Sequence, residues 1–165
     1  MTWSIVWLEA VVFVALFSAM VLIPSIRHPE VGVHNYPPEI QEVYFRTHKR
    51  VDTAPLSART VCIKGFGIVL FTVLLTAGAI WAGASTFLDG FVFAAVLFLI
   101  VGAWDTFFID WVLFAHLRCF RLPGTEHMDK EYAQKWFHVK GMLFPGSLFF
   151  VIIGLLTGIG VLLVG

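Results

Sequence analysis

The chain has 165 residues, of which 59% are hydrophobic and 13% are charged, and its mean hydropathy is +0.87. Soluble domains average about 45–50% apolar and about 25% charged residues, so this composition excludes an ordinary soluble domain and indicates an integral membrane protein. The formal net charge is zero, which gives no argument for nucleic-acid binding. Cys62 and Cys119 are far apart in the sequence, and we expect free thiols in a reducing compartment.

Four segments are long and apolar enough to cross a bilayer, which takes about 20 helical residues. Backbone groups in lipid must be hydrogen-bonded within their own segment, so each span is expected to be helical. The predicted spans are residues 3–26, 65–84, 87–117 and 142–164, with long polar loops at 27–64 and 118–140. We therefore expect an all-α polytopic membrane protein, with a single four-helix transmembrane domain over residues 1–165.

All eleven Lys and Arg residues lie in or at the edges of the two long loops. Cytoplasmic loops are enriched in Lys and Arg, so both loops are expected in the cytoplasm and both termini outside. The first apolar segment has no basic residues before it, and we expect a retained span, not a cleaved signal peptide. Each long loop is also expected to contain one short cytosolic helix, at residues 39–48 and, with Thr125 as N-cap, at residues 126–138.

The third span carries two carboxylates near its predicted cytoplasmic end. As a helix this span would be about 46 Å long, against a hydrocarbon core of about 30 Å, which places both acids near the inner boundary. Asp105 and Asp110 are five residues apart, and so about 140° apart around an α-helix. This spacing predicts that each acid meets a different partner from the loops, such as Arg118, Lys140 or Arg59. Acids in a membrane segment often mark function, but these two could also hold the loops down.

Histidines and acids of the cytosolic layer are the other candidate site residues. If residues 126–138 form one helix, His127, Glu131 and His138 share a face and are a candidate ligand set for a divalent metal. The same face could instead be a solvated polar surface, with Glu131 and Lys135 as an i,i+4 ion pair. No other cofactor is indicated. The candidate catalytic residues are Asp105, Asp110, His116 and Glu131.

Two further features lie within the spans. Glu9 is expected in the outer half of the first span, about 9 Å from its start and too far in depth to pair with Asp105. In the fourth span, the Gly154-x-x-x-Gly158 spacing allows close approach of another helix. That helix belongs either to the same bundle or to a second copy in a homo-oligomer.

The run WDTFFIDWVLF and the later run RLPGTEHMDKEYAQKWFHVKGMLFPG resemble a block found in small bacterial membrane proteins with no assigned activity. The resemblance covers the C-terminal part of the chain and implies a four-span protein of the bacterial inner (plasma) membrane. It implies nothing about a reaction, and no family with an assigned activity matches these motifs.

Two classes of function stay open at this point. In the first, the protein is an enzyme or a binding protein for a lipophilic ligand at the cytoplasmic interface, with membrane lipids as its partners. In the second, a homo-oligomer forms a small transporter or channel, and an accessory subunit of a membrane complex is a further alternative. Polar residues gather at one interface, whereas a transport path needs polar lining through the whole depth of the membrane, so the first class is favoured.

Overall fold

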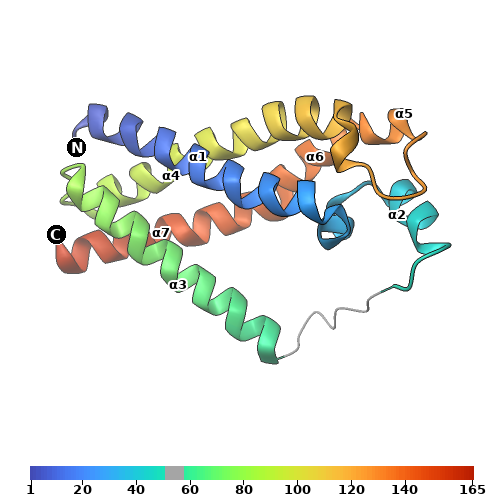
Figure 1. The fold of residues 1–165 in the computed structure, drawn as a ribbon. Helices are drawn as coiled ribbons and strands as arrows, with labels where there is room; N and C mark the ends of the chain where they lie inside the picture. Colours follow the sequence, from blue (N-terminus) through green and yellow to red (C-terminus); the bar gives the residue numbers. More distant parts are fainter. Residues whose placement is uncertain (51–57) are drawn as a thin grey trace. The chain divides into compact units, whose positions relative to one another are not determined.

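The computed structural model describes residues 1–50 and 58–165, which form helices and contain no β-strand. Four of the helical segments are long and apolar enough to cross a membrane, which confirms the predicted all-α, four-span class. The α-helices are α1 (Trp3–Arg27), α2 (Pro38–Phe45), α3 (Ala58–Trp81), α4 (Phe87–Trp104), α5 (Asp129–Tyr132), α6 (Lys135–Gly141) and α7 (Ser147–Val164) (Figure 1). The remaining helical segments are the 3-10 turns η1 (Pro29–Asn35) and η3 (Arg118–Phe120) and the π-helical segments η2 (Asp105–Phe114) and η4 (Met142–Gly146).

The turn between the second and third spans has two local causes. Gly83 has a φ of +83°, a left-handed conformation that a glycine adopts without steric cost and that ends α3. Thr86 and Asp89 then cap α4 reciprocally, because the Asp89 amide donates to Thr86 Oγ1 at 3.1 Å and the Thr86 amide donates to Asp89 Oδ2 at 3.1 Å. The second span therefore ends at Trp81, three residues before its predicted end.

The cytosolic helix predicted at residues 126–138 is wrong in extent, because the structure has two shorter helices, α5 and α6, with a break at Gln134. The Gln134 backbone has a ψ of 80°, outside the helical range. In one straight α-helix Tyr132 and His138 would point about 120° apart. The break instead lets both side chains line one pocket.

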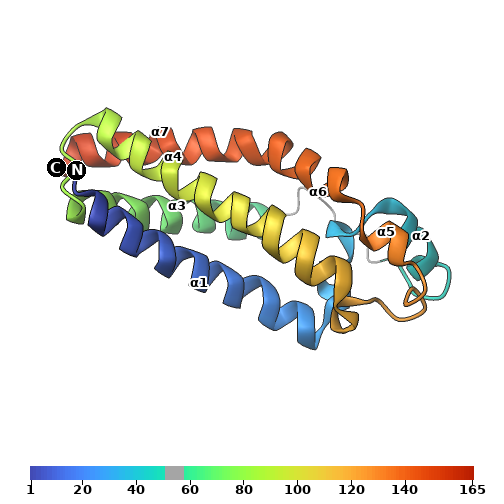
Figure 2. The same ribbon diagram turned by 90° about the horizontal axis from the view of Figure 1, so that it is seen from above.

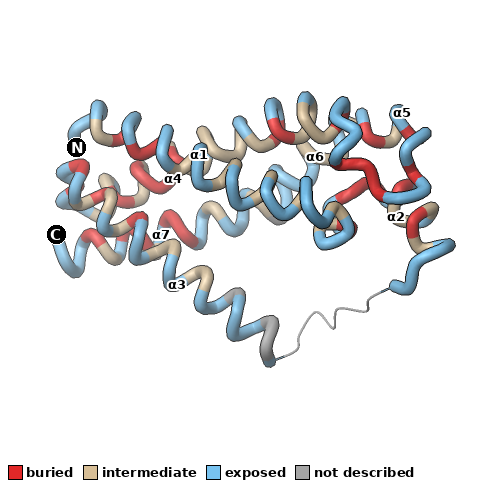
Figure 3. Tube along the Cα trace, in the orientation of Figure 1, coloured by how far each residue is buried: buried red, intermediate tan, exposed pale blue. Residues whose placement is uncertain are grey.

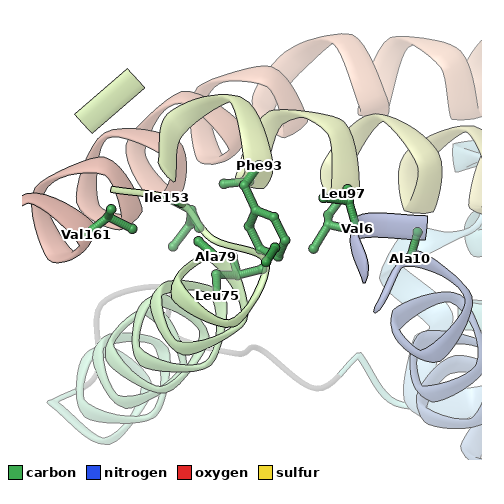
Figure 4. Packing of buried hydrophobic residues seen from close by; sticks show 11 residues of the cluster. Val6, Ala10, Leu75, Ala79, Phe93, Leu97, Ile153 and Val161 are labelled. Carbon is green, nitrogen blue, oxygen red and sulfur yellow. The ribbon is translucent and has the colours of Figure 1, made fainter. Parts of the chain in front are cut away.

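The described chain divides into two compact units, and the prediction of a single domain stays a prediction. The first unit consists of Met1–Phe13, Asp52–Ile100 and Pro145–Gly165, and the second consists of Val14–Val51 and Val101–Phe144. In the first unit, Figure 4 shows Phe93 pointing from α4 toward Leu75 and Ala79 of α3. Helices in lipid gain little from the hydrophobic effect, so tight contacts of this kind hold them together.

Glycines allow α4 and α7 to approach closely in the first unit. A Cβ at Gly158 would lie 2.7 Å from the Phe87 carbonyl oxygen, and a Cβ at Gly90 would lie 3.0 Å from the Gly158 Cα. The small-residue spacing of the fourth span therefore serves packing within the chain. Homo-oligomer formation through it stays a prediction.

Both chain termini lie at the same end of the first unit (Figures 1 and 2). The Thr2 amide donates a hydrogen bond to the Ala82 carbonyl at 2.5 Å, which joins the N-terminus to the turn after α3. The C-terminal Gly165 also lies beside this turn, because a Cβ built there would be 3.6 Å from the Ala84 carbonyl oxygen. The two termini and the short loop therefore share one end of the unit, as an even number of spans requires.

The second unit has its own small core, formed by buried side chains of η1, α2, α5 and the segment after η3. Figure 3 shows buried segments beside α2 and α5. The Tyr36 hydroxyl donates to the Phe120 carbonyl at 2.9 Å, and burial raises the pKa of this hydroxyl. The Tyr132 hydroxyl accepts from the Leu122 amide at 2.9 Å. The core consists of Val33, Tyr36, Ile40, Tyr44, Leu122, Met128 and Tyr132.

We expect Gly158→Ala to destabilise the protein, because the added methyl group would meet the Phe87 backbone, which cannot move as easily as a side chain. Overpacking of this kind costs about 1–3 kcal/mol, more than the gain of about 1 kcal/mol in helix propensity. Thermal unfolding in detergent measures the difference. The matched control is Gly67→Ala, where no atom lies within 4 Å and stability should stay equal or rise. Equal losses in both variants would contradict the assignment.

Candidate functional site

The π-helical segment η2 places Asp105 and Asp110 on the same side of the third span. In a π-helix each amide bonds to the carbonyl five residues earlier, so residues five apart are about one turn apart. The separation of about 140° expected for an α-helix is therefore wrong. Asp105 lies within electrostatic range of both Asp110 and His138. The three side chains form one charged cluster in the second unit.

Asp110 forms an ion pair with His138 when the imidazole is protonated. Asp110 Oδ2 lies 2.9 Å from His138 Nδ1, and the two side chains are only 18% and 13% exposed. His138 belongs to the predicted loop at residues 118–140, so Asp110 does meet a loop residue, although neither Arg118 nor Lys140 is that partner. The third suggested partner, the Arg59 side chain, lies outside the described residues.

A second π-helical segment lies against the first. The Thr106 hydroxyl donates to the Met142 sulfur at 3.4 Å, and a Cβ at Gly102 would be 3.7 Å from the same sulfur. Met142 begins η4, in which Phe144 has an extended backbone, with φ −152° and ψ 123°. Pro145 follows and has no amide hydrogen to donate, which explains why the α-helical hydrogen bonds are interrupted here. Such π-helical turns occur frequently at functional sites.

A pocket of about 140 Å³ opens beside the ion pair. Trp111 forms part of its wall and is held by Lys135: the indole Nε1 donates to the Lys135 carbonyl at 3.3 Å, and Lys135 Nζ lies 5.0 Å from the ring centroid. Several of the lining residues can carry a positive charge, and one carries a negative charge. The lining consists of Asp110, Trp111, Ala115, His116, Tyr132, Ala133, Gln134, Lys135 and His138.

A buried arginine lies behind one wall of this pocket. Arg121 Nη2 donates to the Ala115 carbonyl at 2.8 Å and to Asp129 Oδ1 at 3.0 Å, and its guanidinium carbon lies 3.8 Å from the Tyr132 ring centroid. Ala115 and Tyr132 both line the pocket, so Arg121 fixes two of its walls and adds positive charge nearby. Nε and Nη1 of Arg121 have no hydrogen-bond partner among the described residues.

The other predicted site residues are divided between two places. His116 is exposed and lines the pocket with Asp110 and His138. His127 and Glu131 line a separate surface depression. Across residues 1–50 and 58–165 no group of three or more His, Cys, Asp or Glu side chains is arranged to hold a metal ion. The metal set of His127, Glu131 and His138 thus stays a prediction, and so does the catalytic role of Glu131.

Sequence reasoning missed one charged lining residue, Lys135, which was expected only as the ion-pair partner of Glu131. A lysine and a tryptophan that are far apart in the sequence carry no signal of contact. Their contact depends on where η2 ends and α6 begins.

The chain matches no protein-family model, no curated protein and no solved structure. The resemblance of the C-terminal part to a bacterial block therefore stays an expectation. Four candidate spans indicate a small multi-pass membrane protein, and its described residues include a pocket beside the Asp110–His138 pair.

We expect the two aspartates to respond oppositely to neutralisation. Asp110→Asn removes the charge that faces His138 and should lower the free energy of unfolding by about 1–3 kcal/mol. Asp105→Asn removes a repulsion from Asp110 and breaks no ion pair of the described residues, so stability should stay equal or rise. Thermal unfolding of both variants in one detergent is the measurement. A loss only in Asp105→Asn would refute the assignment of Asp110 as the paired acid.

Proposed function

We propose that this membrane protein binds a lipophilic ligand whose small polar head group enters the pocket around Asp110 and His138. The observation that carries the proposal is the pocket itself, in which the Asp110–His138 pair lies beside Lys135 and His116. Its volume of about 140 Å³ is below the roughly 300–1,000 Å³ of pockets that enclose a whole ligand. A head group fits, and the apolar remainder of the ligand would stay in the lipid.

Exposed aromatic residues beside the pocket support a lipophilic ligand. Phe107 is 52% exposed and packs edge-on against Trp111, with ring centroids 4.8 Å apart. Trp104 and Phe108 form a second pair, with ring centroids 4.4 Å apart. Aromatic rings are enriched at the boundary between lipid and water. An acyl or isoprenoid chain lying along Phe107 would bring its head group to the wall formed by Trp111.

The Asp110–His138 pair suggests which chemistry an enzyme of this kind would perform. A carboxylate at His138 Nδ1 orients the imidazole and leaves Nε2 for a second partner, the arrangement used for general acid–base catalysis. The pocket lining contains no Ser, Thr or Cys that could act as a nucleophile. The carboxylate–imidazole pair makes proton transfer on a bound head group the favoured reaction class, and binding without reaction is the alternative.

We further propose that the pocket faces the cytoplasm of a bacterial cell and that both termini lie outside. The distribution of all eleven Lys and Arg residues supports this orientation. Cys119 tests it directly, because it is exposed and lies in the predicted loop at residues 118–140.

In a Cys62→Ala background, a membrane-impermeant maleimide should label Cys119 in inverted vesicles and not in intact cells. The matched control carries Ser85→Cys without either native cysteine, and it should show the opposite pattern, because Ser85 is exposed in the short loop. Labelling of Cys119 from outside intact cells would reverse the proposed orientation.

Ligand binding is tested by filling the pocket. Ala133→Phe places a ring in the pocket without removing a charged group. We expect this variant to lose the binding of any ligand that native mass spectrometry detects on the wild-type protein. Ala19→Phe is the control, since Ala19 is an exposed residue of α1 outside the pocket and should leave binding unchanged.

The same spectra give the oligomeric state and any bound metal. A ligand retained equally by both variants would place binding elsewhere. A wild-type chain that carries no ligand at all would favour the transporter or accessory-subunit alternatives.

A further inference from the structure

The first unit contains a buried carboxylate that the pocket does not use. Glu9 lies on α1 within a candidate span and is 6% exposed. Its Oε1 has no hydrogen-bond partner among the described residues. Val6 and Ala10 on the same helix belong to the apolar core of this unit, so Glu9 faces protein and not lipid.

The opposite helix leaves space for this carboxylate. Gly78 on α3 faces Glu9 so closely that a Cβ built there would collide with Glu9 Oε2. The same Cβ would also lie 3.2 Å from Phe93 Cζ of α4. A glycine at residue 78 is therefore what allows the acid to sit between α1, α3 and α4. The burial of Glu9 therefore depends on the absence of a side chain at Gly78.

No described charge neutralises Glu9. Among the described residues, no Lys, Arg or His side chain forms an ion pair with Glu9. On α4 the nearest charged side chain is Asp89, which binds the Ser85 and Thr86 amides and interacts with the chain's amino terminus. The described side chains of α3 include no acidic or basic residue. An unpaired carboxylate in such surroundings carries a large free-energy penalty, so Glu9 needs a bound cation.

The surroundings of Glu9 fit a proton better than a metal ion. Calcium and magnesium require about six or more oxygen ligands. The described part of the first unit offers no second carboxylate beside Glu9, and the unpaired hydroxyl of Thr76 faces Gly160 of α7. A proton needs only one ligand oxygen.

We propose that Glu9 is a proton-binding site in the membrane interior. Its carboxyl group takes up and releases a proton reversibly. Release leaves a bare charge against Gly78 and Phe93, so it is coupled to entry of water or to separation of α1 from α3. The site is independent of the ligand pocket, because its residues all belong to the first unit.

The test uses dicyclohexylcarbodiimide, an apolar reagent that adds to a protonated carboxyl group and leaves a stable N-acylurea. We expect the full-length wild-type protein in liposomes to acquire one adduct, which peptide mass mapping assigns to Glu9. Because only the protonated form reacts, the labelling rate should fall about tenfold per pH unit once the pH exceeds the pKa of the group. Absence of an adduct at Glu9, or a rate that does not change with pH, would overturn the proposal.

Variants separate the site from general reactivity of the chain. Glu9→Gln should give no adduct at this position, and Gly78→Ala should change the labelling rate several-fold because it displaces the carboxylate. Gly67→Ala is the control on the same helix and should label like wild type. Because the mapping is done on wild type, the test stands even if Glu9→Gln fails to fold. Protection of Glu9 by sodium or calcium at constant pH would contradict the proton assignment and indicate a metal cation.

Discussion

Polar groups in a membrane layer must find their partners inside the protein, because lipid offers none, and this constraint shapes both units of the chain. In the second unit the constraint is met by pairing: Asp110 faces His138, and Arg121 binds the Ala115 carbonyl and Asp129. These contacts hold three chain segments together around one pocket. In the first unit Glu9 lies among the buried residues of the apolar core, and no described side chain forms an ion pair with it. The same physical rule therefore identifies two different kinds of site.

The pocket and Glu9 also differ in what surrounds them. Around Asp110 the protein supplies charges of both signs and exposed aromatic rings, which suits recognition of a molecule with a polar end and an apolar end. Around Glu9 the protein supplies Gly78, which has no side chain, and the ring of Phe93, and it supplies no ion-pair partner among the described residues. A protein that uses both would bind a lipophilic molecule and respond to protons.

Much of the fold was predictable from sequence, because the number of spans depends on long apolar runs that lipid requires to be helical. The close approach of another helix at Gly158 was also predictable, because small residues four positions apart leave a groove on the helix surface. The π-helical geometry at Asp105 and Asp110 could not be predicted from the sequence. It accompanies a contact between Thr106 and Met142, which are far apart along the chain, and no local sequence pattern marks it. The helix break at Gln134 carries neither proline nor glycine. Consequently the individual acids and histidines could be named as candidates from the sequence, whereas the pairing of Asp110 with His138 could not.

The two π-helical segments have a mechanical consequence. Each π turn holds one residue more than an α turn, and converting one to α-helix would rotate everything after it by about 100°. At η2 such a conversion would turn Asp110 away from His138, and back again on reversal, without unwinding the helix or changing the residues at its two ends. Asp105 and Asp110 therefore lie on a helical segment in which a change from π-helix to α-helix would shift the following residues by one position around the helix. Such a conversion would break the contact between Asp110 and His138 that lies beside the pocket.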